Sequence, residues 1–329
     1  MAALATSDGV DLSQGVLCAG NIVYDVLVRP VEEIRWGATT WVERIEPHLG
    51  GNGASTAVTL ARLKVPVRLL GAVGPDPFGR LAMDKLREAG CDVSRVTKAS
   101  SQTATTVALV NGVGARSFQH CPGASHEVFL APIPFHPELT SKHKHFHVAN
   151  IFGLPGLRSH GGETLRRAKA AGLSTSLDTG WDAKGEWFAV LGPCLPHLDL
   201  LFVNEDEARM LTGNGEIAMA AEFFMERGVG GVVVKLGGHG CAVFGSGQPL
   251  FIPAFGANVI DTTGAGDCFV GGFLAGLHAG LDWAEAARWG NAAGALNVAS
   301  LGGSAGIPSR DEFLKFLHSS EVSQATELK

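Results

Sequence analysis

The sequence predicts an α/β fold: a doubly wound, mainly parallel sheet with helices on both faces, and a small antiparallel β lid. From residue 145 onward, short apolar runs alternate with segments of helical period, which is typical of parallel strand pairing. A hydrophobic content of 46% with 18% charged residues predicts a sizeable core. Because no internal repeat or low-complexity linker divides the chain, we expect one domain over 15–320, with lid segments at about 30–48 and 100–121 and polar tails at 1–14 and 321–329.

The first half of the chain predicts two strand–helix pairs followed by a hairpin. Asn52 precedes a segment of helical period and is available as its cap, and Gly90 would end the second helix. Asn111-Gly112 is a turn dipeptide between two runs of strand character. The predicted elements are a strand at 16–28, a helix at 54–64, a strand at 67–74, a helix at 78–90 and a hairpin within 103–120.

The second half predicts alternating strands and helices. Ser309 and Glu312 form a capping box at the start of a late helix. In the helix before it, Gly272, Gly276 and Gly280 recur every four residues, a spacing that lets another backbone approach closely. The predicted strands are 145–150, 173–178, 198–204 and 231–238, and the helices between them are 162–172, 205–213 and 215–228.

Charge and composition narrow the range of partners and cellular locations that we expect. The net charge of −6, without a dense basic run, argues against nucleic acid as the main partner. No apolar run approaches the roughly 18 residues of a membrane span. The six cysteines are scattered without a C-x-x-C pair, and the first residues lack a secretory signal, so we expect a cytoplasmic protein.

The segment "DTTGAGD" (261–267) carries the strongest chemical signal. Gly264, Ala265 and Gly266 are small residues at the start of a predicted helix, where backbone N–H groups and the helix dipole can bind an anion. Asp267, on the first turn, could accept the proton of an attacking hydroxyl. The alternative is a glycine-rich helix start in which Asp267 only complements the dipole.

The run "DTTGAGDCFVGGFLAGL" resembles the C-terminal signature of the ribokinase-like (PfkB) family of carbohydrate kinases. "GGNGASTAVTLARLK" with "LLGAVGPDPFG" resembles the N-terminal signature, and "VNEDEA" and "VVVKLGGHGC" match two further motifs in the family's order, over roughly 16–310. The resemblance implies an ATP-dependent sugar kinase with Mg²⁺. Asp267 would be the general base, and Gly264, Ala265 and Gly266 would form the anion hole.

The resemblance also implies a sugar site. Asp25 falls where the family binds sugar hydroxyls, a task that suits an acceptor-only carboxylate, and Gly50 and Gly51 match the sugar-contacting pair. Many family members carry Asn where this chain has Ser55, a shorter hydroxyl that Asn52 could compensate for. The substrate therefore stays open among ribose, fructose, a nucleoside and a 2-keto-3-deoxy sugar acid.

On the nucleotide side, the resemblance implies that Asn204 and Glu207 help to hold Mg²⁺, with Glu207 acting through water, and a helix cap with a first-turn acid is the alternative. Asp261 and Thr263 match positions that bind a monovalent cation such as K⁺ in some relatives. The residues implied to bind ATP are Lys235, Gly238, Gly240 and Asn291.

Other functions are less favoured. A dehydrogenase would carry G-x-G-x-x-G directly after the first strand, and no P-loop motif occurs. A non-catalytic sugar or nucleotide sensor would not need the complete motif.

His143, His145 and His147 would share one face of a strand and could bind a metal, although core histidines or a solvated strand edge are favoured. Relatives often dimerise through the lid, and the strand pattern near Trp41 and Val42 permits this.

Overall fold

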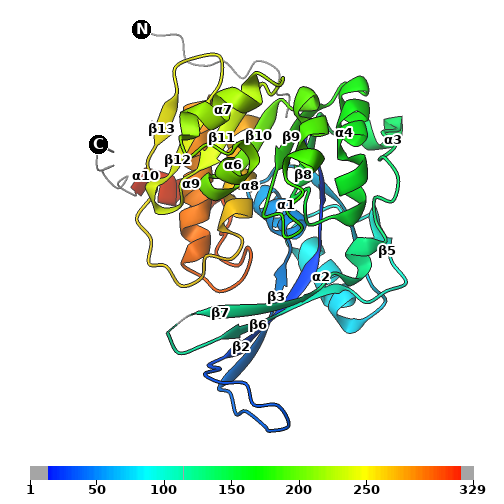
Figure 1. The fold of residues 1–329 in the computed structure, drawn as a ribbon, viewed down its shortest axis with the longest axis vertical. Coiled ribbons are helices and arrows are strands. Elements are labelled where there is room, and N and C mark those ends of the chain that lie inside the picture. Colours follow the sequence, from blue (N-terminus) through cyan, green and yellow to red (C-terminus); the bar gives the residue numbers. More distant parts are fainter. Residues whose placement is uncertain (1–13, 114, 320–329) are drawn as a thin grey trace.

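The computed structural model describes residues 14–113 and 115–319, so the predicted tails lie almost entirely outside the described residues. Its centre is a nine-stranded sheet in the order β13-β12-β11-β10-β9-β8-β1-β4-β5 (Figure 1). The pairs from β5 to β11 are parallel, and β12 and β13 add an antiparallel edge. The strands are β1 (Val16–Gly20), β4 (Val67–Val73), β5 (Val96–Lys98), β8 (His145–Ala149), β9 (Ser174–Asp178), β10 (Leu200–Asn204), β11 (Gly231–Lys235), β12 (Cys241–Phe244) and β13 (Leu250–Ile252).

Helices cover both faces of this sheet and create two separate cores. Along β1, Val16 and Cys18 belong to one hydrophobic cluster and Leu17 and Ala19 to the other, because side chains alternate across a strand. The first cluster contains α1 (Asn52–Arg62), α2 (Pro77–Glu88), α8 (Ala265–His278), α9 (Trp283–Val298) and α10 (Arg310–Ser319). The second contains α3 (Pro137–Thr140), α4 (Pro155–Ala170), α5 (Phe188–Leu191), α6 (Glu205–Thr212) and α7 (Ile217–Met225).

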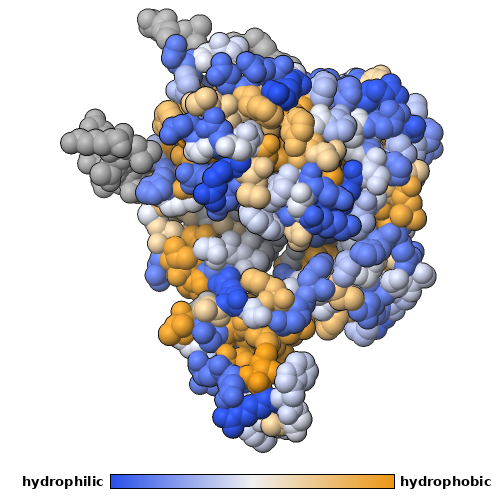
Figure 2. Space-filling view, in the orientation of Figure 1, coloured by the Kyte–Doolittle hydropathy of each residue, from blue (hydrophilic) through white to orange (hydrophobic). Residues whose placement is uncertain are grey.

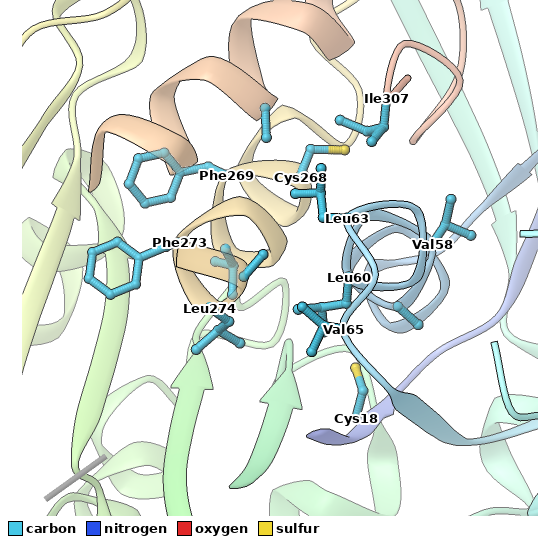
Figure 3. Packing of buried hydrophobic residues seen from close by; sticks show 14 of the residues in the cluster. Cys18, Val58, Leu60, Leu63, Val65, Cys268, Phe269, Phe273, Leu274 and Ile307 are labelled. Atoms are coloured by element: carbon cyan, nitrogen blue, oxygen red, sulfur yellow. The ribbon is translucent and has the colours of Figure 1, made fainter. Parts of the chain in front are cut away.

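Helix α8 packs closely against α1 and α9 (Figure 3). A Cβ added at Gly272 would lie 2.6 Å from the carbonyl oxygen of Trp289, and one at Gly276 would lie 2.8 Å from Ala286 Cα. The predicted close approach is therefore confirmed for these two glycines. It is wrong for Gly280, which follows the helix with φ 77° and faces open space, so its glycine serves the left-handed turn instead.

A four-stranded sheet projects from the body (Figure 1). It comprises two antiparallel hairpins joined by a parallel pair between β2 and β6. The predicted first strand at 16–28 is wrong as a single element, because β1 ends at Gly20 and the chain turns at Asn21 and Ile22 into the small sheet. The order is β3 (Arg44–Gly50), β2 (Val23–Arg29), β6 (Ala104–Val110) and β7 (Arg116–Cys121), and we call this sheet the lid.

The order of the large sheet fixes where a ligand can bind. The chain runs from β1 to β4 on one side and later to β8 on the other, so β1 and β8 flank the point where the winding direction reverses. Gly20 and Ala149 are register partners there, and Asn21 and Asn150 follow them at the carboxyl ends. Ligands of open α/β sheets bind in this crevice. Within 14–113 and 115–319, no helix is long and apolar enough to cross a bilayer.

Candidate active site

The first turn of α8 lies at this crevice and opens with a left-handed residue. Gly264 caps the helix with φ 72°, and a Cβ there would collide with the carbonyl of Gly303, so only glycine fits. The N–H of Ala265 is 3.2 Å from the carbonyl of Thr262. The N–H groups of Gly266 and Asp267 make no hydrogen bond to the described residues, and they remain available to an anion.

Asp267 is held by a chain of two asparagines. Its side chain is nearly buried, with 8% of the residue exposed, and Asn52 Nδ2 donates to its Oδ1 at 2.8 Å. Asn150 Nδ2 donates in turn to Asn52 Oδ1 at 2.9 Å. Burial raises the pKa of Asp267 above its usual value, although the Asn52 hydrogen bond and the charge of Lys235 oppose this. The prediction that Asn52 caps α1 is wrong: Gly51 is the cap residue, and the Asn52 side chain turns toward the aspartate.

A small polar cavity of about 240 Å³ opens in front of Asp267. Gly50 does not line it; a Cβ there would collide with the Asp25 carboxylate, so the glycine makes room for that side chain. Burial raises the pKa of Asp25 to about 6. The predicted residues that line the cavity are Asp25, Gly51, Asn52, Ser55, Thr263, Gly264 and Asp267, and those the sequence did not suggest include Asn21, Thr106 and His120.

A second and larger cavity of about 400 Å³ lies on the other side of the α8 first turn. Most of its lining residues are glycines and apolar residues, among them Phe255 and Phe269. Because Gly264 and Asp267 line the small cavity while Ala265 and Gly266 line the large one, the two cavities share this turn as a wall. The predicted nucleotide residues Lys235, Gly238, Gly240 and Asn291 all line the large cavity.

Two of these nucleotide-side residues already have partners. Lys235 Nζ lies 2.7 and 2.8 Å from the two carboxylate oxygens of Asp178. Burial alone would lower the pKa of Lys235, but the Asp178 carboxylate raises it, so the ammonium stays charged. Asn291 is buried, and its Nδ2 donates to the carbonyls of Ile252 and Pro253, at 2.9 and 3.1 Å, which fixes the loop along the cavity.

Asn204 and Glu207 line neither cavity. They form a capping box for α6, in which Asn204 Oδ1 accepts from the Glu207 amide at 2.8 Å and Glu207 Oε2 accepts from the Asn204 amide at 2.9 Å. Thr179 Oγ1 also donates to Glu207 Oε2, at 2.7 Å. The cap that the sequence offered as the alternative is therefore present, and a role in binding Mg²⁺ stays a prediction.

Asp261 and Thr263 are occupied by an arginine from the lid. Arg116 Nη1 lies 2.5 Å from Asp261 Oδ1 and 3.0 Å from Thr263 Oγ1. A monovalent cation does not fit against these two oxygens while the guanidinium is there. No pattern in the sequence indicated this contact.

The three histidines before and within β8 are core residues. His143, His145 and His147 are all buried, and His145 and His147 are both hydrogen bonded to the Ser176 hydroxyl, so the two on the strand share one face as predicted. Burial lowers the pKa of His147 well below its usual value. In the part of the chain that the structure describes, no group of three or more His, Cys, Asp or Glu side chains could hold a metal ion.

One of the missed residues had a usable signal. Asn150 ends the predicted strand at 145–150, and the carboxyl ends of parallel strands meet at one edge of the sheet. Thr106, His120 and Arg116 had none, because their position depends on how the lid packs over the body.

Comparisons with known proteins agree with this architecture. Residues 13–310 match the model of the pfkB family carbohydrate kinases. The chain is 30% identical to a fructokinase of Vibrio alginolyticus, covering 82% of this chain and 91% of that one, and 28% identical to a ribokinase of Haemophilus influenzae, covering 91% and 96%. The structure of Arabidopsis thaliana ribokinase complexed with ribose and ATP superposes with a TM-score of 0.83 at 26% identity, covering 93% of this chain and 99% of that chain. The predicted fold and family are confirmed: the chain belongs to the pfkB family of carbohydrate kinases.

Proposed function

We propose that this carbohydrate kinase transfers the γ-phosphoryl group of ATP to the primary hydroxyl of a small neutral sugar such as ribose or fructose. One observation carries the proposal: the Asp267 carboxylate and the free amides that open α8 form the wall between a polar cavity and an apolar one. A sugar hydroxyl in the small cavity and a triphosphate reaching across from the large one would meet at this turn.

The chemistry follows from the groups at the wall. Asp267 accepts the proton of the attacking hydroxyl, and its raised pKa makes it a better base than a solvated aspartate. Asn52 orients the carboxylate through its hydrogen bond at 2.8 Å. The Gly266 and Asp267 amides, with the positive end of the helix dipole, stabilise charge on the phosphoryl oxygens. The nucleotide base would lie among the apolar walls of the large cavity.

Magnesium would accompany the nucleotide and neutralise phosphate charge. Glu207 Oε1 makes no hydrogen bond within the described residues, so it can accept from metal-bound water. Such indirect binding suits Mg²⁺, which loses its water ligands reluctantly. Lys235, next to Gly266, would face the phosphates. A monovalent cation at Asp261 is not part of this proposal, because Arg116 occupies those oxygens.

The lining of the small cavity favours a neutral substrate. Its acidic side chains are Asp25 and Asp267, and neither lysine nor arginine lines it among the described residues. A sugar acid would therefore place its carboxylate in the same small cavity as two others, and the repulsion between like charges would disfavour its binding. A nucleoside is the second candidate, because an adjoining cavity of about 150 Å³ shares Asp25 and Thr106, and Leu27 and Phe118 line it beside Arg116.

A panel of substrates assayed by coupled ADP release tests the proposal. We expect turnover with a neutral pentose or hexose and not with 2-keto-3-deoxygluconate. Turnover confined to nucleosides would favour the second candidate, and turnover of the sugar acid would contradict the charge argument. Binding of sugar and ATP without ADP release from any compound would indicate a non-catalytic sensor and contradict the proposal.

We also propose a homodimer formed through the lid. Trp36 and Trp41, in the loop between β2 and β3, are 97% and 91% exposed, and Ile45 at the start of β3 is exposed as well, so this end of the lid carries apolar surface that a monomer rarely leaves open (Figure 2). Sedimentation of the wild type and of a Trp36→Ser/Trp41→Ser variant tests this. A dimer that the double substitution dissociates supports the proposal, and a wild-type monomer at micromolar concentration contradicts it.

The cytoplasmic location predicted above is kept as part of the proposal. All six cysteines are free thiols, and five of them are buried. Free thiols favour a reducing compartment. Imaging of the tagged chain in its own cells would test this, and export from the cell would contradict it.

A further inference from the structure

The segment that leads into α8 is shaped by a buried carboxylate. Asp261 is 1% exposed, its Oδ1 accepts from the Thr263 amide at 2.7 Å, and its Oδ2 accepts from the Gly302 amide at 3.0 Å. Gly303, the next residue, places its carbonyl against Gly264 at the cap of α8. The position of the helix-opening amides therefore depends on how Asp261 holds these two loops together.

A buried carboxylate needs a positive partner, because an unpaired charge in the interior is strongly destabilising. Burial alone would raise the pKa of Asp261, but the hydrogen bonds from Gly302 and Thr263 and the charge of Arg116 lower it, so the group is ionised. Its positive partner is Arg116, which comes from β7 of the lid and not from the body.

The hydroxyl and carbonyl oxygens of Thr263 also accept hydrogen bonds. Arg116 Nη1 bonds Thr263 Oγ1 at 3.0 Å, and Asn297 Nδ2 donates to the Thr263 carbonyl at 2.9 Å. Asn297 Oδ1 is buried without a partner in the described part of the chain. The alternative to the arginine is a cation bound by Asn297 Oδ1 and the Thr263 carbonyl. That arrangement would require the Asn297 side-chain amide to turn, because its Nδ2 faces the carbonyl in this structure.

We propose that the Arg116 guanidinium is a built-in counter-ion for Asp261, taking the place of a monovalent cation at the segment that opens α8. Arg116 is then a positioning residue: it touches no reacting atom and acts through Asp261 on the amides of Gly266 and Asp267. Since Arg116 belongs to the lid, the counter-charge reaches the segment when the lid lies against the body. Closure over the sugar would thereby also complete the phosphoryl site.

The inference rests on the proposed kinase activity, so its test has a second readout. Wild type, Arg116→Ala and Arg116→Lys are compared in tetramethylammonium, Na⁺ and K⁺ buffers, by coupled ADP release and by thermal unfolding without ligands. We expect the wild type to change by less than about twofold in kcat between these ions. For Arg116→Ala we expect kcat to fall about tenfold in tetramethylammonium, as loss of a charged hydrogen bond implies, with a smaller change in sugar KM.

Rescue distinguishes a missing charge from a damaged lid. K⁺, or guanidinium at a non-denaturing concentration, should restore part of the Arg116→Ala activity and raise its unfolding temperature, and Arg116→Lys should lie between the two. Arg44→Ala is the matched control, since Arg44 is an exposed lid arginine whose one ion pair with the described residues is to Glu46, at 3.8 Å, and it should behave as wild type in every buffer.

Three results would overturn the inference. They are strong activation or thermal stabilisation of the wild type by K⁺, wild-type behaviour of Arg116→Ala, and a loss in Arg116→Ala that no cation restores. If no sugar were turned over, the proposed function would fail, while the ion dependence of the unfolding temperature would still test the counter-ion.

Discussion

The two cavities that share the first turn of α8 are lined by different kinds of chemical group. The small one is lined by side chains from several distant segments, including Asn21, Asn52, Thr106 and His120. The large one is lined mostly by glycines and apolar side chains, and its lining comes from the last third of the chain. Main-chain groups and shape would recognise the ligand of the large cavity, whereas the small cavity relies on individual hydrogen-bonding side chains.

Because of this difference, the two cavities should respond differently to amino-acid substitution. A site made from backbone at a helix start needs only small residues in a local order, and "DTTGAGD" supplies them. A site made from side chains changes its ligand when one of them changes. Each substitution below should disturb one cavity and spare the other.

The largest effect on the free energy of unfolding is expected from Lys235→Met, on the nucleotide side. The substitution leaves the buried Asp178 without its partner, and we expect a loss of about 3 kcal/mol in the free energy of unfolding together with weaker ATP binding. Chemical denaturation and ATP titration measure both. Lys169→Met, which breaks the more exposed pair with Asp199, should cost much less, and equal losses would refute the burial argument.

Asn52→Ala should act on the sugar side. It removes the donor to Asp267 and frees Asn150, so we expect kcat to fall about tenfold, the effect of losing one hydrogen bond to a charged group. ATP binding should stay unchanged in the same preparation. Asn214→Ala, which alters a surface asparagine, is the control, and a kcat equal to that control would show that Asp267 needs no orienting partner.

A smaller effect is expected from Asn291→Ala. Loss of its bonds to the Ile252 and Pro253 carbonyls loosens one wall of the large cavity, and we expect the KM for ATP to rise about fivefold, as about 1 kcal/mol implies. Steady-state kinetics with varied ATP measures this. A matching rise in sugar KM would mean that the two cavities are not independent.

The smallest effect is a pH dependence of sugar binding. Because the pKa of Asp25 is raised to about 6, the group takes up a proton as the pH falls through that value, and the neutral acid is a weaker acceptor for sugar hydroxyls with fewer free lone pairs. We expect sugar affinity, measured by calorimetry, to drop about fourfold at about pH 5.5 relative to neutral pH, with ATP affinity unchanged. Asp25→Asn should bind sugar weakly and without this pH dependence; a persistent dependence would assign the titration to another group.

Local patterns predicted most of the fold and the helix-opening motif. Alternating apolar runs indicated the parallel strands, and the capping box at Ser309 and Glu312 is present as expected. The single strand predicted at 16–28 was wrong because composition does not reveal that Gly20 packs against Gly53 while the chain turns away at Asn21.

Contacts between distant segments could not be predicted in this way. Arg116 meets Asp261 across 145 residues, and Asn52 meets Asp267 across 215. Neither pairing leaves a periodic or spaced signal, since each depends on the packing of the lid or of α1 against α8.

The most direct test of the account is the turnover of Asp267→Asn with the best sugar of the panel. We expect kcat to fall about a thousandfold while the affinities for sugar and ATP change only a few-fold, because an amide keeps the shape of the carboxylate and cannot act as the base. Asp311→Asn, which alters the first-turn aspartate of α10 away from both cavities, should keep wild-type turnover. An Asp267→Asn enzyme that turned over within tenfold of the wild type would contradict the assignment of Asp267 as the base.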